Sequence, residues 1–146
     1  MTHRLDYVAI NGPAIQSMLA AKRHMPSIDV GFRALLELRV SQINGCTYCI
    51  DLHTKEAKAS GEAPARLGAL PEWRGNTLFS AREQAALAWA ESLTRVETDG
   101  APDVLYDALL AHFSEKEVVD LTLIIAQMNA WNRLAIGFEK PEIATT

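Results

Sequence analysis

Cysteine is scarce in this sequence, since only Cys46 and Cys49 occur among its 146 residues. Runs of Lys or Arg are missing as well, and the formal net charge is −4. A protein that binds nucleic acids or acidic membrane surfaces usually carries clustered basic residues. We therefore expect neither nucleic acid nor a membrane among the partners.

Long apolar runs are also missing. The first residues, MTHRLDYVAINGP, lack the apolar stretch of a signal peptide. The most apolar segment, residues 121–138, contains Gln127, Asn129, Asn132 and Arg133, so we expect a buried or interface helix there and not a membrane span. Without a mark of export, the expected location is the reducing cytoplasm, where a close cysteine pair is not a permanent cross-link.

Alternating strand patterns are lacking too. Hydrophobic residues make up 49% of the chain and charged residues 22%, as in ordinary soluble globular proteins. A length of 146 residues suits one domain with its own core. We predict a single all-α domain over residues 1–146, with about six to seven helices.

Helix start and stop signals divide the first half of the chain. Ser27 or Asp29 can cap a helix that ends at Asn44-Gly45, because both of these residues tolerate the left-handed conformation. The next helix starts near Cys46 and ends at Gly61. The predicted helices of this half cover residues 11–24, 29–43 and 46–61.

The second half carries two repeats of a capping pattern. Ser80 to Glu83 and Ser114 to Glu117 each have the Ser-x-x-Glu order of a capping box and precede an apolar-periodic run. Pro102 opens a further helix between them. Residues 64–76 are predicted to form a short helical turn and a loop.

Cys46, Cys49 and His53 stand three and four positions apart, so they share one face of the third helix. A thiol must lose its proton to become a good nucleophile. The helix N-terminus favours a thiolate at Cys46, whereas an imidazole one turn away favours Cys49. Because specific contact with a base outweighs a partial charge that fades within a turn, we predict that Cys49 is the nucleophile. Cys46 can then resolve its oxidised form as a disulfide.

Other interpretations of the pair are weaker. A closed zinc site needs four ligands and only three are clustered, although His3, His24 or His112 could supply a fourth. Covalent haem attachment needs a histidine directly after the second cysteine, where Ile50 stands. A thioredoxin-type site needs a strand before its helix. Two unrelated buried cysteines remain possible, but His53 on the same face favours redox chemistry without a metal or cofactor.

The segment LRVSQINGCTYCIDLHTKEA, residues 38–57, closely resembles the core motif of AhpD-like alkylhydroperoxidases of the carboxymuconolactone decarboxylase superfamily. REQAALAWAESLT and NAWNRLAI are similar to segments of single-motif members, and the likeness covers most of residues 5–140. The resemblance implies an all-helical fold and homo-oligomers, either trimers or hexamers. It also implies reduction of peroxides by thiols, which a dithiol donor regenerates.

The resemblance also implies roles for individual residues. Cys49 would attack the peroxide, Cys46 would form the disulfide with it, and His53 would relay a proton between a glutamate and the thiol. The family glutamate usually stands twelve positions before the first cysteine, where this chain has Ala34. Glu37, one turn further along the same helix, and Glu83, in the segment shared with single-motif members, are the candidates to replace it.

Each of these acids has a plain structural alternative. Glu37 can be a solvated surface acid paired with Arg33, four residues earlier. Glu83 occupies the reciprocal position of the Ser80 capping box. Tyr48 can line the site or pack elsewhere, and the large aromatic residues are expected in the core or at a subunit interface: Trp89, Trp131 and Phe138.

Two functions of other classes stay open. A redox sensor could use the same pair to switch its oligomeric state without turnover. A lyase acting on a small lactone or acid could retain the thiols incidentally, although decarboxylase members of the superfamily characteristically lack the cysteine pair. The leading prediction is a cytoplasmic thiol peroxidase.

Overall fold

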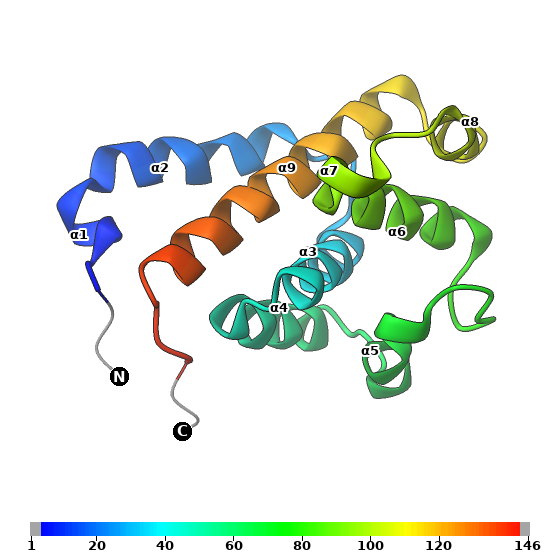
Figure 1. Ribbon diagram of the computed structural model, residues 1–146. Coiled ribbons are helices and arrows are strands. Elements are labelled where there is room, and N and C mark those ends of the chain that lie inside the picture. The colour runs from blue at the N-terminus through cyan, green and yellow to red at the C-terminus, as the bar shows by residue number, and fades with distance from the viewer. Residues whose placement is uncertain (1–3, 144–146) are drawn as a thin grey trace.

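The computed structural model describes residues 4–143, and every regular element in that range is helical (Figure 1). The described elements are the α-helices α1 (Tyr7–Ile10), α2 (Gly12–Ala20), α3 (Val30–Asn44), α4 (Thr47–Ala59), α5 (Pro64–Ala69), α6 (Ala81–Thr94), α7 (Val96–Asp99), α8 (Asp103–Leu110) and α9 (Glu115–Gly137), and two 3₁₀-helices, η1 (Ala21–His24) and η2 (Leu70–Glu72). The predicted all-α class is confirmed.

Helices are more numerous than the predicted six to seven, because the described range contains nine α-helices. The additional ones are short. α1 and α7 are single turns of four residues, which show no apolar periodicity in the sequence. Asp6 is the N-cap of α1, and its side chain accepts a hydrogen bond from the backbone N–H of Ala9.

The predicted boundaries follow local capping chemistry. Asp29 caps α3 by accepting from the N–H of Phe32, whereas Ser27, the other candidate, donates to the Asp120 carboxylate at 2.6 Å. Gly45 ends α3 with a φ of 68°, as its position predicted. Both capping boxes, at Ser80 and at Ser114, are formed.

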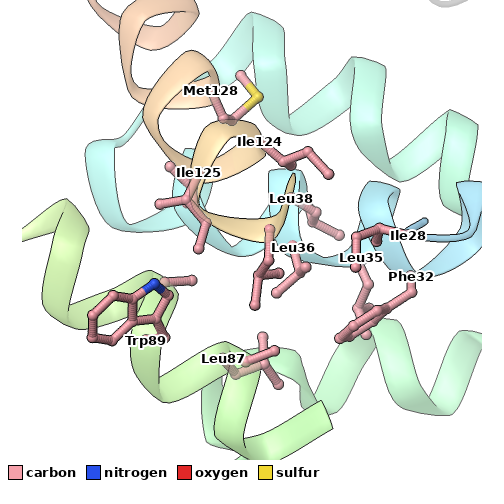
Figure 2. Close-up of a cluster of buried hydrophobic side chains, with 14 of the residues drawn as sticks. Ile28, Phe32, Leu35, Leu36, Leu38, Leu87, Trp89, Ile124, Ile125 and Met128 are labelled. Atoms are coloured by element: carbon pink, nitrogen blue, oxygen red, sulfur yellow. The ribbon is translucent and has the colours of Figure 1, made fainter. Parts of the chain in front are cut away.

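Helix α3 lies at the centre of the molecule and packs against α4, α6 and α9. In Figure 2, its side chains Leu35, Leu36 and Leu38 meet side chains of α6 and α9 in one cluster. Because neighbours cover α3 on all sides, even charged residues in its middle are withdrawn from water. This central position decides the environment of the functional site.

Helix α2 covers one side of the bundle and runs near α9 (Figure 1). The Gln127 amide of α9 donates a hydrogen bond to the carbonyl of Met18 in α2. At the C-terminus of α9, the N–H of Arg4 donates to the carbonyl of Phe138 at 2.8 Å. Residues 4–24 therefore form a wall beside α9.

Length and apolarity decide whether any of the described helices could cross a membrane. Not one of those between residues 4 and 143 combines the length and the apolarity that crossing a bilayer requires. The apolar segment at residues 121–138 lies within α9 and its C-terminal cap, and its polar side chains Asn129 and Asn132 are buried in contact with α3 and α6.

A charged network joins α3, α6 and the loop after η2. Glu91 accepts hydrogen bonds from Arg39, Trp73 and Arg74, at 2.7 to 3.1 Å. Burial alone would raise the pKa of Glu91, but the Trp73 indole and the guanidinium groups outweigh it and leave the pKa below the ordinary value.

The Glu91→Gln change is therefore expected to lower the free energy of unfolding by about 1–3 kcal/mol at neutral pH. A depressed carboxyl pKa stabilises the fold above the unfolded pKa, and this contribution disappears as the pH falls through the folded value. Denaturant unfolding at pH 7 and at progressively lower pH should show the wild type and the variant converging below about pH 4. If the free energies of unfolding of the two proteins differed by the same amount at every pH, the lowered pKa of Glu91 would not be the cause of the difference.

Candidate functional site

The two cysteines lie at the turn from α3 into α4. Gly45 ends α3, and Cys46 is the N-cap of α4, with its Sγ accepting from the N–H of Cys49 at 3.4 Å. Cys46 thus precedes the helix on which the sequence analysis placed it. The two residues are joined as a disulfide, with Cα atoms 5.3 Å apart. The cysteine pair is thus in its oxidised form.

Cys49 and Cys46 line different cavities. A cavity of about 290 Å³, here named the Cys49 cavity, is lined by Cys49, His53 and Glu37, and its other walls are largely apolar. A surface cavity of about 550 Å³, here named the Cys46 cavity, is lined by Cys46 and by residues of the α9 C-terminus and the segment after it. The disulfide therefore stands between two adjoining hollows, which share Tyr48, Ala135 and Lys140 in their walls.

His53 is buried on α4, one turn after Cys49. Its Nδ1 lies 2.8 Å from Glu56 Oε2, so an Nδ1–H can donate to that carboxylate. This hydrogen bond is the main reason why the pKa of Glu56 is below its ordinary value. His53 Nε2 faces the other acid, at 3.7 Å from Glu37 Oε2. The ring is thus held between two carboxylates.

Glu37 is buried in the middle of α3, with 6% of its surface exposed. The alternative that it is a solvated surface acid is wrong, because α3 is covered by its neighbours at this point. Burial raises the pKa of Glu37 above its ordinary value, against the opposing attraction of His53 and Lys22. Lys22 Nζ lies 3.6 Å from Glu37 Oε1, and that oxygen has no hydrogen-bond partner within residues 4–143.

Glu83 lies away from this site and does not line the Cys49 cavity. It closes the Ser80 capping box and forms an ion pair with Arg66, which also binds Glu62 at 2.6 Å. Burial would raise the pKa of Glu83, but Arg66 and the Ser80 N–H lower it overall. The structure thus brings Glu37 to His53 and places Glu83 in a structural ion cluster.

The aromatic residues divide between core and site. Trp89 is buried and donates to Thr122 at 3.0 Å, as expected for a core residue. Phe138 packs against Tyr7, with ring centroids 5.5 Å apart. Trp131, however, lines the Cys49 cavity, and Tyr48 lines both cavities.

The remaining histidines do not join the cysteines in the described range. His24 and His112 are exposed, and His3 lies outside the described residues. In the part of the chain from residue 4 to 143, no group of three or more His, Cys, Asp or Glu side chains is arranged to hold a metal ion.

Four charged neighbours of the site were not predicted to belong to it, although Arg33 was named as a possible partner of Glu37 at the surface. Glu56 stands three residues after His53, and this spacing was a usable signal because it puts both on one helix face. Lys22, Arg33 and Lys140 also line the Cys49 cavity. No local pattern marks Lys22 or Lys140, because they come from segments far from the motif in sequence.

Comparison with known proteins identifies the family. The model of the carboxymuconolactone decarboxylase family matches residues 13–92, more than half of the chain. The chain belongs to this family. Among its relatives is the uncharacterized protein YdfG of Bacillus subtilis (strain 168), which is 38% identical over 139 residues, covering 94% of this chain and 95% of YdfG.

Solved structures of similar proteins have the same fold. A protein of unknown function from Agrobacterium tumefaciens, provisionally named an antioxidant defence protein AhpD, matches with a TM-score of 0.92 and 32% identity, over 99% of this chain and 100% of that one. An uncharacterized peroxidase-related protein from Ralstonia eutropha JMP134 with an AhpD core matches with a TM-score of 0.79 and 18% identity, over 93% and 74% of the two chains. The predicted AhpD-like fold is confirmed.

Proposed function

We propose that this member of the carboxymuconolactone decarboxylase family is a thiol peroxidase that reduces organic hydroperoxides or hydrogen peroxide. One observation carries the proposal: Cys49, paired with Cys46, shares a largely apolar cavity with His53 and Glu37. A nucleophile, a group that transfers protons and a resolving thiol are the parts that such a reaction needs. Neither metal nor cofactor is required for it.

The first step consumes the peroxide. The Cys49 thiolate attacks one peroxide oxygen, so that an S–O bond forms while the O–O bond breaks. The departing alkoxide takes a proton from the imidazolium of His53 and leaves as the alcohol, and Cys49 becomes a sulfenic acid. The thiol has lost two electrons and the peroxide has gained them.

The second step closes the disulfide. Cys46, as a thiolate, attacks the sulfur of the sulfenic acid, the S–S bond forms, and hydroxide leaves and is protonated to water. A dithiol donor, either a protein or a lipoyl-type compound, then reduces the disulfide by exchange and is itself oxidised. In this proposal the donor approaches the disulfide from the side of the Cys46 cavity, which opens at the molecular surface.

His53 and its two acids supply the protons. Glu56 accepts from Nδ1 and so directs Nε2 towards the cavity and Glu37. Glu37 takes the place of the family glutamate that is Ala34 here, because its buried carboxyl, with its raised pKa, can hold a proton close to the ring. Glu83 would serve helix capping instead.

Self-association belongs to the same proposal. Several apolar side chains stay exposed on the single chain, including Val104 at 71% and Val119 at 57%. We expect a homo-oligomer, a trimer or a hexamer, acting in the cytoplasm without nucleic acid or membrane partners. Size-exclusion chromatography with light scattering under reducing and oxidising conditions measures the subunit number and detects any redox switch.

The direct test is peroxide-dependent consumption of a dithiol. The purified wild-type protein is incubated with dihydrolipoamide and cumene hydroperoxide, and both loss of thiols and formation of cumyl alcohol are measured. We expect one alcohol per dithiol consumed, and loss of activity after thiol alkylation. Absence of peroxide-dependent turnover with any dithiol tested would refute the proposal, as would turnover that survives alkylation.

A further inference from the structure

Arg33 is a largely buried arginine whose side chain has no hydrogen-bond or ion-pair partner among residues 4–143. About 9% of its surface is exposed, and its Nε is buried without a hydrogen-bond partner among residues 4–143. Withdrawing a charged group from water is costly unless another group binds it, so buried charges are normally paired. Arg33 lines the Cys49 cavity, and the reaction proposed above does not use it.

The cavity also carries an excess of positive charge. Lys22, Arg33 and Lys140 line it, against the carboxyl groups of Glu37 and Glu56. Burial raises the pKa of Glu37, which shifts this acid towards its neutral form, and the carboxylate of Glu56 is engaged by His53. The lining therefore favours an anionic occupant. The negative charge of this occupant would lie next to Arg33.

Arg33 lies at a distance from the reacting sulfur. Glu37 and His53 are each eight residues from Gly45, and their side chains meet across the turn where α4 folds back on α3. Arg33 is one helical turn beyond Glu37, while Cys49 is one turn before His53. Along the helix pair, the backbone of Arg33 is thus about two turns, or about 11 Å, from that of Cys49.

Apart from its charged and polar residues, the lining of the Cys49 cavity is apolar. Leu52, Ile124, Met128 and Trp131 line the Cys49 cavity, whose volume of about 290 Å³ is near the lower end of small-molecule sites. An occupant must therefore combine an apolar body with a charge at the end remote from the sulfur. Neutral or very small peroxides would leave Arg33 unpaired.

We propose that Arg33 binds the carboxylate of the substrate, and that the substrates are hydroperoxides of apolar monocarboxylic acids. A planar guanidinium suits a carboxylate because it can donate two parallel hydrogen bonds. The proposal rests on the proposed peroxidase function for its reaction, in which the O–O bond breaks as above and a hydroxy acid is released. Binding of the acid itself does not depend on catalysis.

The first test uses the wild-type protein alone. Turnover of linoleic acid hydroperoxide is compared with that of its methyl ester, with dihydrolipoamide as the reductant and concentrations below those that form micelles. We expect kcat/KM for the acid to exceed that for the ester by about tenfold or more, because a charged hydrogen bond is lost in the ester. Turnover of cumene hydroperoxide with no preference for the acid overturns only this inference, whereas no turnover of any hydroperoxide overturns the proposed function.

The second test measures binding without chemistry. Affinities for decanoate and for methyl decanoate are determined by calorimetry on the wild type, Arg33→Met, Arg33→Lys and the matched control Arg23→Met, an exposed arginine outside the cavity. The measured quantity is the ratio of the affinity for decanoate to the affinity for methyl decanoate. This ratio should fall towards one in Arg33→Met, rise again in part in Arg33→Lys and stay at the wild-type value in Arg23→Met. An Arg33→Met protein that keeps the preference would refute the inference, and so would a wild type that shows none, even if Arg33→Met does not fold.

Discussion

Cys49→Ser is expected to abolish peroxide turnover, lowering kcat/KM by at least about 10³-fold, because a serine hydroxyl at neutral pH cannot replace a thiolate nucleophile. Cys49 lines the cavity together with His53, so the loss should be the same for every peroxide tested. The coupled assay with dihydrolipoamide and cumene hydroperoxide measures it. A Cys49→Ser protein that retains a tenth of the wild-type rate would contradict the role of Cys49.

Cys46→Ser provides the matched variant, since it removes the other sulfur of the same disulfide. Its Cys49 should still react once with peroxide and then remain as a sulfenic acid, which dimedone traps and mass spectrometry detects. Trapping at Cys46 in the Cys49→Ser protein, with none at Cys49 in the Cys46→Ser protein, would reverse the assignment of the two thiols.

Local chemistry explains why part of this architecture could be predicted. Asp29 and Gly45 bound α3 through caps that depend only on neighbouring backbone groups, and both predictions are confirmed. The i, i+4 spacing of Cys49 and His53 likewise places them on one face of whatever helix contains them. These predictions depend on local sequence alone and need no knowledge of the tertiary structure.

The environment of Glu37 could not be deduced in the same way. All residues from Phe32 to Leu38 are buried, so this part of α3 has no face exposed to solvent. A charged residue in this segment therefore does not indicate a surface position, as it would in an ordinary amphipathic helix. Whether Glu37 faces water or His53 depends on how α4 and the segment before α3 pack around it. The same holds for Lys22 and Lys140, which reach the cavity from opposite ends of the chain.

The separation of the two sulfurs is also a tertiary property. A spacing of three residues predicts that Cys46 and Cys49 lie on one side of a helix. In the structure, Cys46 is instead the N-cap of α4 and lines a cavity with the C-terminal end of α9. A pair that was predicted to share one face therefore faces two cavities. This division supports the proposal that peroxide and reductant approach from different sides.

Replacing the proton-transfer groups is the second change with a large expected effect. His53→Asn and Glu37→Gln should each lower kcat/KM for peroxide by about 10²-fold, the usual contribution of one acid–base group. The double variant should be little worse than the more damaging single one, because groups that transfer one proton in series act as a unit. Effects that multiply in the double variant would show that Glu37 and His53 act independently.

Glu83→Gln is the matched control, because it makes the same chemical change in the other candidate acid. It weakens the ion pair with Arg66 and one half of the Ser80 capping box, so it should lower the free energy of unfolding by about 1 kcal/mol while leaving kcat/KM near the wild-type value. A loss of activity in Glu83→Gln equal to that in Glu37→Gln would place the relay acid at residue 83.

Measurements of the free energy of unfolding provide a second way to distinguish the roles of Glu37 and Glu83. The pKa of Glu37 is raised in the fold, so its ionised carboxylate opposes folding above the ordinary carboxyl pKa, and this cost grows until the pH exceeds the folded value. Glu37→Gln should therefore not lower the free energy of unfolding at pH 7, and should raise it relative to the wild type as the pH increases from 4 towards neutrality. An inactive but equally stable or more stable Glu37→Gln protein is the result expected of an acid that is kept in the core for chemistry, and an unstable one would show that Glu37 serves the fold.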